Sequence, residues 1–322
     1  MTALTDTSLE LHGSFARHET FHPRYGWLKK GFDQASHDPG VFLREDATTI
    51  LGVGKNMVRA IRYWCLAYKV LVEERRDDNF RLFDLSPTDF GRRLLGDEGW
   101  DPYLEDPGSL WLLHWQLLRS PCRAPAWWAI FNNGRSSQFS DAALLEELRR
   151  FRDEHEEWED VADGSLEKDV RCLLRMYGSV TQGRDLLEDS VDSPFAELEL
   201  IRPIPGAKRQ WTLNVNLKRH LPDAIVAHAC LDYALMSDSS ARVIGVAGLA
   251  RNPGSPGRAF ALTEVAIQDS LARYSEQHAT PIRLTHSAGN VQLVLPDHVE
   301  AATIAILDRY YARRRGRSRG NQ

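Results

Sequence analysis

Histidine and acidic side chains capable of chemistry lie close together near the N-terminus, in the run HETFH at residues 18–22. Its spacing matches HExxH, in which a helix presents two histidines to zinc and the glutamate acts as a base. Pro23 follows His22 directly, however, and a residue before proline is pushed out of the α region, so the turn that would aim His22 at a metal does not form. We therefore reject a zinc protease and keep His18 and Glu19 as candidates for phosphoester chemistry.

Carboxylates elsewhere could hold a divalent ion. Metal-dependent nucleases place two or three carboxylates around the ion, often with a lysine nearby, to polarise the phosphate and activate water. Glu197 and Glu199 alternate on a strand-like run, which would put both on one face. No ExK motif follows them, and a solvated strand face is the simpler interpretation. Lys168 and Asp169 form a further pair, with Lys168 outward and Asp169 at the edge of a buried helix stripe.

These patterns predict two overlapping sets of site residues. The predicted catalytic residues are His18, Glu19, Lys168 and Asp169. The predicted ligands for Mg²⁺ or Mn²⁺ are Glu19, Asp169 and Glu199. The sequence contains no Walker loop, dinucleotide fingerprint or nucleophile elbow, which argues against the common nucleotide-dependent and serine-hydrolase classes.

A basic stripe is predicted on one helix. Lys55, Arg59 and Arg62 recur three and four residues apart, so a helix from Lys55 to Tyr68 would place them opposite an apolar face. Upstream, Asp46 can cap a short helix that ends at Leu51, and two glycines then supply a turn. The order helix, turn, helix is typical of DNA-reading proteins.

A hairpin is expected directly after the basic helix. Residues 70–74 and 80–85 resemble strands around a polar loop, and Thr88 can cap the helix that follows. This order predicts an N-terminal winged helix-turn-helix that contacts DNA through Lys55, Asn56, Arg59, Arg62, Arg75 and Arg76. A winged helix can also bind proteins, in which case the stripe is a solvated helix face.

Composition restricts the class of protein. The chain has 322 residues, 43% hydrophobic and 26% charged, with a net charge of −5. A nucleic-acid surface must therefore be local rather than global. The basic end with Arg313, Arg314 and Arg315 predicts a flexible arm that attracts phosphate, or alternatively a solubilising tail. No apolar run is long enough to span a membrane and no secretory signal is recognisable, so we expect a cytoplasmic protein.

The chain is expected to form a mainly α, α+β protein of three parts. These are a winged-helix domain (13–95), a helical tryptophan-rich domain (96–200), and a smaller α/β domain after the Pro/Gly-rich segment 201–207 (201–322). In the last part, a helix, a hairpin and a second helix resemble another winged helix. The dense tryptophans indicate a core or an oligomer interface, so a homodimer is possible. Four widely spaced cysteines are expected to be buried.

Several runs together resemble an uncharacterised bacterial family found in phage-defence loci, whose best-understood members are similar to the B subunit of the Ssp single-strand DNA phosphorothioation system. These runs are FARHETFHPRYGWLKKG (15–31), LGVGKNMVRAIRYW (51–64), SPTDFGRRLLGDEGWDPYLEDPGSLWLLHW (86–115) and EKDVRCLLRMY (167–177). The resemblance implies a DNA-nicking nuclease that works beside a cysteine desulfurase, an ATP pyrophosphatase-like sulfurtransferase and an ATPase. Nicking would allow sulfur to replace a non-bridging phosphate oxygen. The alternative is a non-enzymatic DNA-binding adaptor that recruits the sulfur-transfer enzymes.

Overall fold

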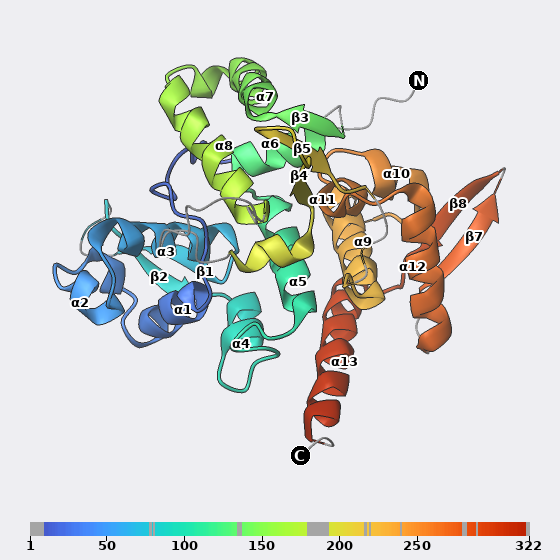
Figure 1. Cartoon of the computed structure of the whole chain (residues 1–322). Coiled ribbons are helices and arrows are strands. Elements are labelled where there is room, and N and C mark those ends of the chain that lie inside the picture. Colours follow the sequence, from blue (N-terminus) through green and yellow to red (C-terminus); the bar gives the residue numbers. More distant parts are fainter. Residues whose placement is uncertain are drawn as a thin grey trace.

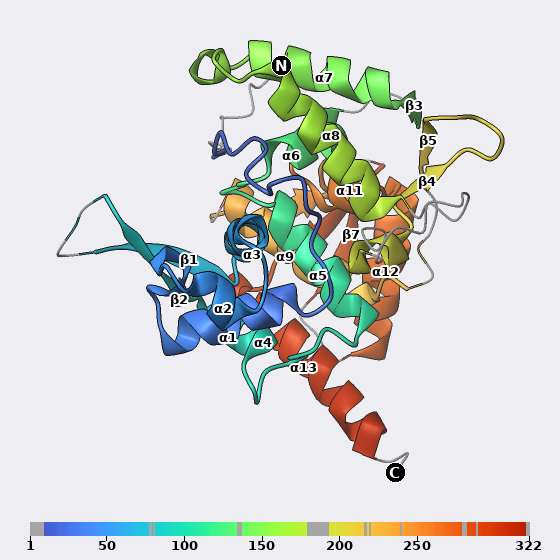
Figure 2. The ribbon, with the colours of Figure 1, turned by 60° about the vertical axis from the view of Figure 1, so that its left-hand side comes forward.

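The N-terminal unit follows the predicted order of helix, turn, helix and hairpin (Figure 1). The computed structural model describes residues 10–76, 79, 81–133, 137–178, 193–215, 218, 220–238, 240–278, 282–287 and 289–319. The elements of this unit are α1 (Trp27–His37), the short 3-10 helix η1 (Val41–Leu43), α2 (Ala47–Leu51), α3 (Lys55–Ala67) and the antiparallel strands β1 (Leu71–Arg75) and β2 (Phe83–Pro87). The hairpin projects away from the rest of the molecule (Figure 2).

Helices α1 and α3 approach closely because Gly31 has no side chain. A Cβ atom at Gly31 would lie 2.6 Å from Cys65 Sγ and 2.8 Å from Ile61 Cγ2. The apolar face of α3 is buried as its spacing predicts, with Ile61 and Trp64 inaccessible to solvent. Between α2 and α3, Gly52 adopts a left-handed conformation with φ of 61°, which glycine tolerates without strain.

Local signals predicted the ends of two helices with different success. The Thr88 side chain accepts a hydrogen bond from Gly91 N at 2.9 Å, which confirms the predicted cap of α4 (Asp89–Leu95). The predicted cap by Asp46 is wrong, because its carboxylate makes no capping bond and instead accepts two hydrogen bonds from Arg44, both at 2.8 Å. An adjacent arginine thus outcompetes the backbone for Asp46.

Helices dominate the middle of the chain and bury its tryptophans. They are α5 (Pro107–Leu118), α6 (Pro125–Asn133), α7 (Asp141–Asp153) and α8 (Asp163–Tyr177), with the short η2 (Glu156–Trp158) and η4 (Pro194–Leu198). Trp111, Trp115 and Trp127 are each at most 1% exposed. In the described part of the chain these rings therefore form core rather than an exposed surface.

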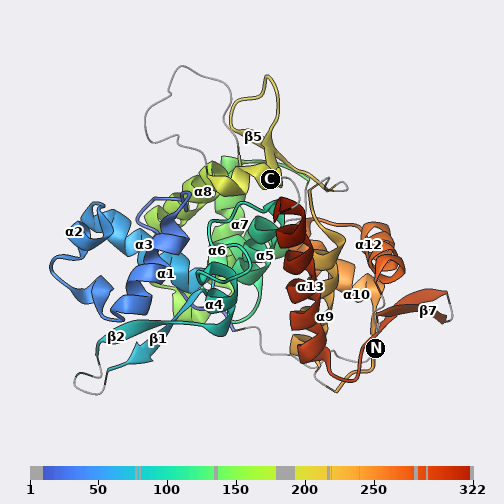
Figure 3. The ribbon, with the colours of Figure 1, turned by 90° about the horizontal axis from the view of Figure 1, so that it is seen from below.

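A second helix-and-hairpin unit follows in the C-terminal part. It contains α9 (Asp223–Ser237), β6 (Val243–Gly245), α10 (Val246–Arg251), α11 (Pro256–Phe260), α12 (Glu264–Gln277), β7 (Arg283–Ser287), β8 (Asn290–Val294) and α13 (Val299–Arg319). Its antiparallel sheet has the order β6-β8-β7. Helix α13 packs along α9 and passes beside α4 (Figure 3). Val265 of α12 is apolar but 65% exposed, so it does not belong to the buried face of this helix.

A three-stranded sheet joins the middle of the chain to the C-terminal part. Its order is β3-β5-β4, where β3 is Gln138–Ser140, β4 is Ile201–Pro203 and β5 is Gln210–Leu213. The proposed division between residues 200 and 201 therefore runs close to a shared sheet, and one apolar core includes residues from all three predicted domains.

Two further expectations concern apolar segments and cysteines. Across the described ranges, we find no helix that is both long and apolar enough to cross a membrane. The cysteines Cys65, Cys122, Cys172 and Cys230 are free and buried, as predicted.

His114 joins three helices inside the core. Its ring nitrogens lie 2.8 Å from the Tyr177 hydroxyl and 2.7 Å from the Ala259 carbonyl oxygen, so α5 is tied to α8 and to the end of α11. Since the carbonyl can only accept, Nε2 carries a proton and Nδ1 can accept from the tyrosine hydroxyl. Burial lowers the pKa of His114 from 6.5 to about 4.

Acidification from pH 7 to pH 5 should therefore destabilise the fold through His114. The unfolded state binds this proton more readily, so stability is lost as the pH falls from above 6.5 towards 4, by about 2 kcal/mol at pH 5. His114→Gln should have a smaller pH-dependent loss, measured by urea unfolding at both pH values. The exposed His220→Gln serves as the control, and an unchanged pH dependence in His114→Gln would contradict the assignment.

Candidate functional site

The structure brings His18 and Asp169 together although 151 residues separate them. His18 Nε2 lies 2.7 Å from Asp169 Oδ1, and Thr20 N donates to His18 Nδ1 at 3.0 Å. Because Nδ1 accepts this bond, the ring is neutral and its proton lies on Nε2, which donates to the carboxylate. Ala16 N donates to the same carboxylate oxygen at 2.9 Å.

This pair is sealed inside the protein. The side chains of His18 and Asp169 are 0% and 1% exposed, and Tyr63, Trp64 and Trp127 surround the imidazole with ring-centre distances of 5.6–6.1 Å. The prediction that Asp169 lies at the edge of the α8 stripe is therefore wrong. Burial raises the pKa of Asp169, and its Oδ2 has no hydrogen-bond partner among the described residues. The pair is placed to position its neighbours rather than to touch a substrate.

Glu19, which follows His18 in the sequence, reaches the surface. Its backbone has φ of 50°, with Ala16 at 55° and Thr20 at 69°, so three non-glycine residues of one short segment are left-handed. Such strain persists only where the surroundings enforce it, and it is concentrated at functional sites. The side chain of Glu19 is 33% exposed and lies 3.5 Å from Arg59 of α3. Segment 15–20 forms turns, which agrees with the rejection of an HExxH helix.

The predicted metal-ligand set is not assembled. In the described ranges, no three His, Cys, Asp or Glu side chains lie close enough to hold a metal ion together. Asp169 is buried, whereas the Glu19 side chain is 33% exposed. Glu197 and Glu199 belong to and follow the 3-10 helix η4, so the predicted strand is wrong, and Glu199 instead pairs with Arg202. Lys168 is exposed on α8, beside the buried Asp169.

The predicted basic stripe on α3 is partly engaged by the protein's own acids. Lys55, Asn56 and Arg59 are exposed. Arg62, in contrast, donates to Glu73 Oε1 of β1 at 2.7 Å. This bond ties the helix to the hairpin, so Arg62 is not a freely available cation.

The remaining predicted cations lie in the hairpin and at the C-terminus. Arg75 lies over the Phe83 ring at 5.6 Å, and Arg76 lies 3.8 Å from Asp84. Arg313 Nη1 lies 2.7 Å from His278 Nε2, and the backbone is helical as far as Arg319, so the expected flexible arm is the end of α13. The side chains of Arg314 and Arg315 lie outside the described residues.

Arg123 is a cation near α3 that spacing did not reveal. It lies in the loop between α5 and α6 and donates to Glu73 Oε2 at 2.7 Å, opposite Arg62. No local pattern could have found it, because 50 residues separate it from Glu73. Only the folding of this loop against β1 creates the contact.

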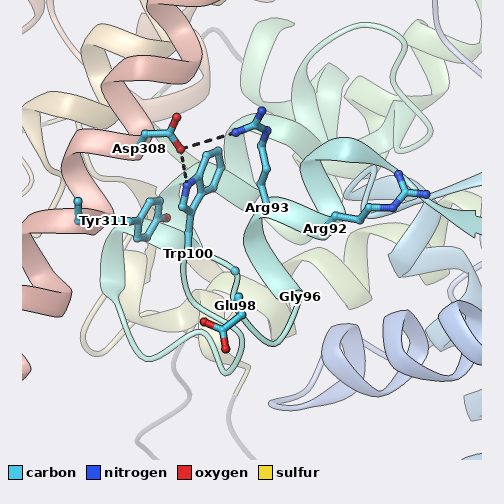
Figure 4. Close-up of a pocket in the computed structure, with 9 residues that line it drawn as sticks. Arg92, Arg93, Gly96, Glu98, Trp100, Asp308 and Tyr311 are labelled. Carbon is cyan, nitrogen blue, oxygen red and sulfur yellow. Dashed lines mark hydrogen bonds and ion pairs between the residues drawn. The ribbon is translucent and has the colours of Figure 1, made fainter.

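A cleft between α4 and α13 forms the other notable surface feature (Figure 4). Its volume is about 660 Å³. Trp100 stacks on Tyr311 at a ring-centre distance of 5.3 Å and donates to Asp308 at 2.9 Å, while Arg93 lies 3.7 Å from the same carboxylate. The cleft carries both cations and carboxylates, so its charge favours neither an anion nor a cation.

The buried pair generates a stability prediction. His18→Ala should leave the Asp169 carboxylate without its charge-assisted hydrogen bond and lower the free energy of unfolding by about 3 kcal/mol. Asp169→Ala should cost a similar amount, and the double variant should cost less than the sum because both changes remove one interaction. Urea unfolding would measure this, with the exposed Asp160→Ala as the control. Additive losses below about 1 kcal/mol would contradict the pairing.

Comparisons with known proteins agree with this architecture. Residues 15–311 match the family described as protein of unknown function (DUF4007). An SspB crystal structure is 38% identical with a TM-score of 0.88, covering 96% of this chain and 91% of that chain. A magnesium ion-bound SspB crystal structure is 38% identical with a TM-score of 0.87, covering 94% and 89%. No curated protein matches the chain. The resemblance to the Ssp B subunit is thus confirmed, and the chain belongs to the SspB family and to the family DUF4007.

Proposed function

We propose that this protein is a DNA-binding nicking endonuclease that acts in DNA phosphorothioate modification and phage defence. The observation that carries the proposal is the 38% identity to SspB over 96% of the chain. Its proposed partners are the cysteine desulfurase, the ATP pyrophosphatase-like sulfurtransferase and the ATPase of the same system. The nick would open one strand where sulfur replaces a non-bridging oxygen.

The N-terminal unit supports DNA binding by its order of elements. We interpret α1, α2, α3 and the β1–β2 hairpin as a winged helix, in which α3 enters the major groove and the hairpin is the wing. Leu85 N donates to Pro39 O at 2.9 Å, so residue 39 takes the place of the short first strand of such units. Lys55, Asn56 and Arg59 are the exposed residues of the first turns of α3.

The C-terminal unit follows a similar order but carries different charges. We interpret helices α9, α10 and α12 with the sheet β6-β8-β7 as a second winged helix, on the basis of their order. The exposed face of α12 includes Asp269 and Glu276, and its Arg273 binds Asp223 at 2.7 Å. Carboxylates repel phosphate, so we assign DNA reading to the N-terminal unit alone.

For the cleavage itself we propose Glu19 as the carboxylate that acts on the phosphodiester. Its side chain is partly exposed and lies next to Arg59, and the residue directly follows His18, which is bonded to Asp169. Magnesium supplies charge neutralisation in such reactions and commonly binds through one or two carboxylates, with water and phosphate as further ligands. Glu19 fits one such position, and the magnesium ion-bound SspB structure supports this metal. Lys168 is a further exposed candidate on the adjoining helix.

A non-enzymatic DNA-binding adaptor is the second candidate function. It is favoured by the burial of His18 and Asp169, which leaves two of the four predicted catalytic residues out of reach of a substrate. Both candidates require the basic face of α3, but only the nuclease requires Glu19.

The nicking assay separates the two candidates. Purified protein should convert supercoiled plasmid to open circles with Mg²⁺ but not with EDTA. Glu19→Gln should lower the rate by at least about a hundredfold, the size expected from loss of a metal-ligand or base carboxylate. DNA binding should be retained, and the exposed Glu276→Gln on α12 should nick at the normal rate. DNA binding without any nicking would favour the adaptor.

The basic face of α3 should set the salt dependence of DNA binding. Lys55→Ala and Arg59→Ala should each weaken binding, and each should reduce the slope of log K against log salt by about 0.9 for duplex DNA if it removes one phosphate contact. Fluorescence anisotropy at several salt concentrations measures the slope. Arg150→Ala on α7, an exposed arginine that also pairs with a glutamate, is the control. Unchanged slopes in both α3 variants would refute this interface.

A further inference from the structure

Glu73 is held between two arginines from different parts of the chain. Arg62 of α3 donates to Oε1 and Arg123 of the α5–α6 loop donates to Oε2, both at 2.7 Å. The three side chains are 31%, 30% and 21% exposed for Arg62, Arg123 and Glu73 respectively, so the group lies at the surface without being fully solvated. Partial burial strengthens each charge-assisted bond relative to a fully exposed ion pair.

The charges of this group do not cancel. Two guanidinium groups surround one carboxylate, which leaves an excess of one positive charge at a surface adjoining the exposed face of α3. Burial alone would raise the pKa of Glu73, but the charge of Arg123 and the bonds from both arginines outweigh burial and lower it. Glu73 is therefore ionised at neutral pH, and it presents two anionic oxygens to two arginines. A backbone phosphate presents its two non-bridging oxygens to arginines in a comparable way.

The backbones of both arginines are held in place by contacts that do not involve Glu73. Arg62 lies within α3, one turn after Arg59. The Arg123 carbonyl accepts from the Tyr63 hydroxyl at 3.2 Å, and the preceding residue, Cys122, is buried and bonded to the segment at Glu10 and His12. The arginines should thus stay near their positions when the carboxylate leaves.

We propose that Arg62 and Arg123 form a clamp for a DNA backbone phosphate, and that Glu73 occupies the anion position of this clamp in the free protein. This inference rests on the proposed DNA-binding function. On binding, one phosphodiester replaces the carboxylate, Glu73 turns towards solvent, and no covalent bond changes. Through Arg123, the clamp adds a DNA contact from the middle of the chain to those of the N-terminal unit. Glu73 competes with the phosphate for both arginines and thereby weakens DNA binding.

Glu73→Gln tests the competition directly. A neutral amide holds two guanidinium groups less strongly than a carboxylate, so duplex DNA should bind about fivefold more tightly, the size of one typical net hydrogen bond. Arg123→Ala should weaken binding and reduce the salt slope by about 0.9, one phosphate contact. In the double variant Glu73→Gln/Arg123→Ala, the gain from Glu73→Gln should disappear. Glu74→Gln, the next residue of β1, which binds Ser86, is the matched control.

The outcomes separate this inference from the proposed function. If the wild-type protein fails to bind DNA, both are overturned. If it binds, but Glu73→Gln binds less tightly or equally well, the bridge is purely structural and the clamp alone is overturned. Thermal unfolding of each variant shows whether a loss of affinity reflects a loss of fold. Inorganic phosphate at matched ionic strength is a second probe. Stabilisation by phosphate that is stronger in Glu73→Gln than in the wild type would support an anion position between the two arginines, and equal stabilisation of both proteins would count against it.

Discussion

The position of the N-terminal segment depends on one buried contact, the 2.7 Å hydrogen bond from His18 to Asp169. It is formed in an aromatic environment where an unpaired carboxylate would be costly, so the segment cannot leave α8 without exposing or isolating that charge. The same segment accepts a hydrogen bond from Trp64 of α3 through the Phe21 carbonyl at 2.9 Å. The segment is thereby held against both α8 and α3. The bonds of His18 and Thr20 on either side of Glu19 enforce its strained backbone conformation.

The fold was predicted from sequence wherever the signal was local. The apolar spacing of α3, the Thr88 cap and the hairpin all follow from interactions within a few residues, so their residue types sufficed. The failures involve competition with distant or unexpected partners. Asp46 was expected to cap a helix, but its carboxylate binds Arg44 instead. The burial of Asp169 depends on a segment some 150 residues away, which no periodicity within α8 can reveal.

The candidate site was predicted in part for the same reason. His18 and Glu19 were found because they are adjacent to each other in sequence, and Arg59 because of helical spacing. The involvement of Glu73 and Arg123 was missed, since their contact arises only when a loop of the helical middle packs against β1. Glu199 was grouped with Glu19 and Asp169 by residue type alone, and the structure does not assemble these three into a metal site. Residue type identifies candidates, but only the fold decides which of them meet.

Under the proposed DNA-binding function, the acids paired with the arginines near α3 account for how a chain of net charge −5 could bind a polyanion. Arg59 faces Glu19, and Arg62 and Arg123 share Glu73, so most of these cations are already balanced in the free protein. A polyanion that does not contact these arginines directly is attracted only weakly by them, because nearby carboxylates neutralise their charge. In the proposed clamp, a phosphate that fits between the two arginines replaces the Glu73 carboxylate, which then moves into solvent. Pairing these arginines with acids therefore weakens non-specific attraction of DNA more than it weakens a contact in which a phosphate fits between the arginines. Under the proposed function, this favours specificity of DNA binding over overall affinity.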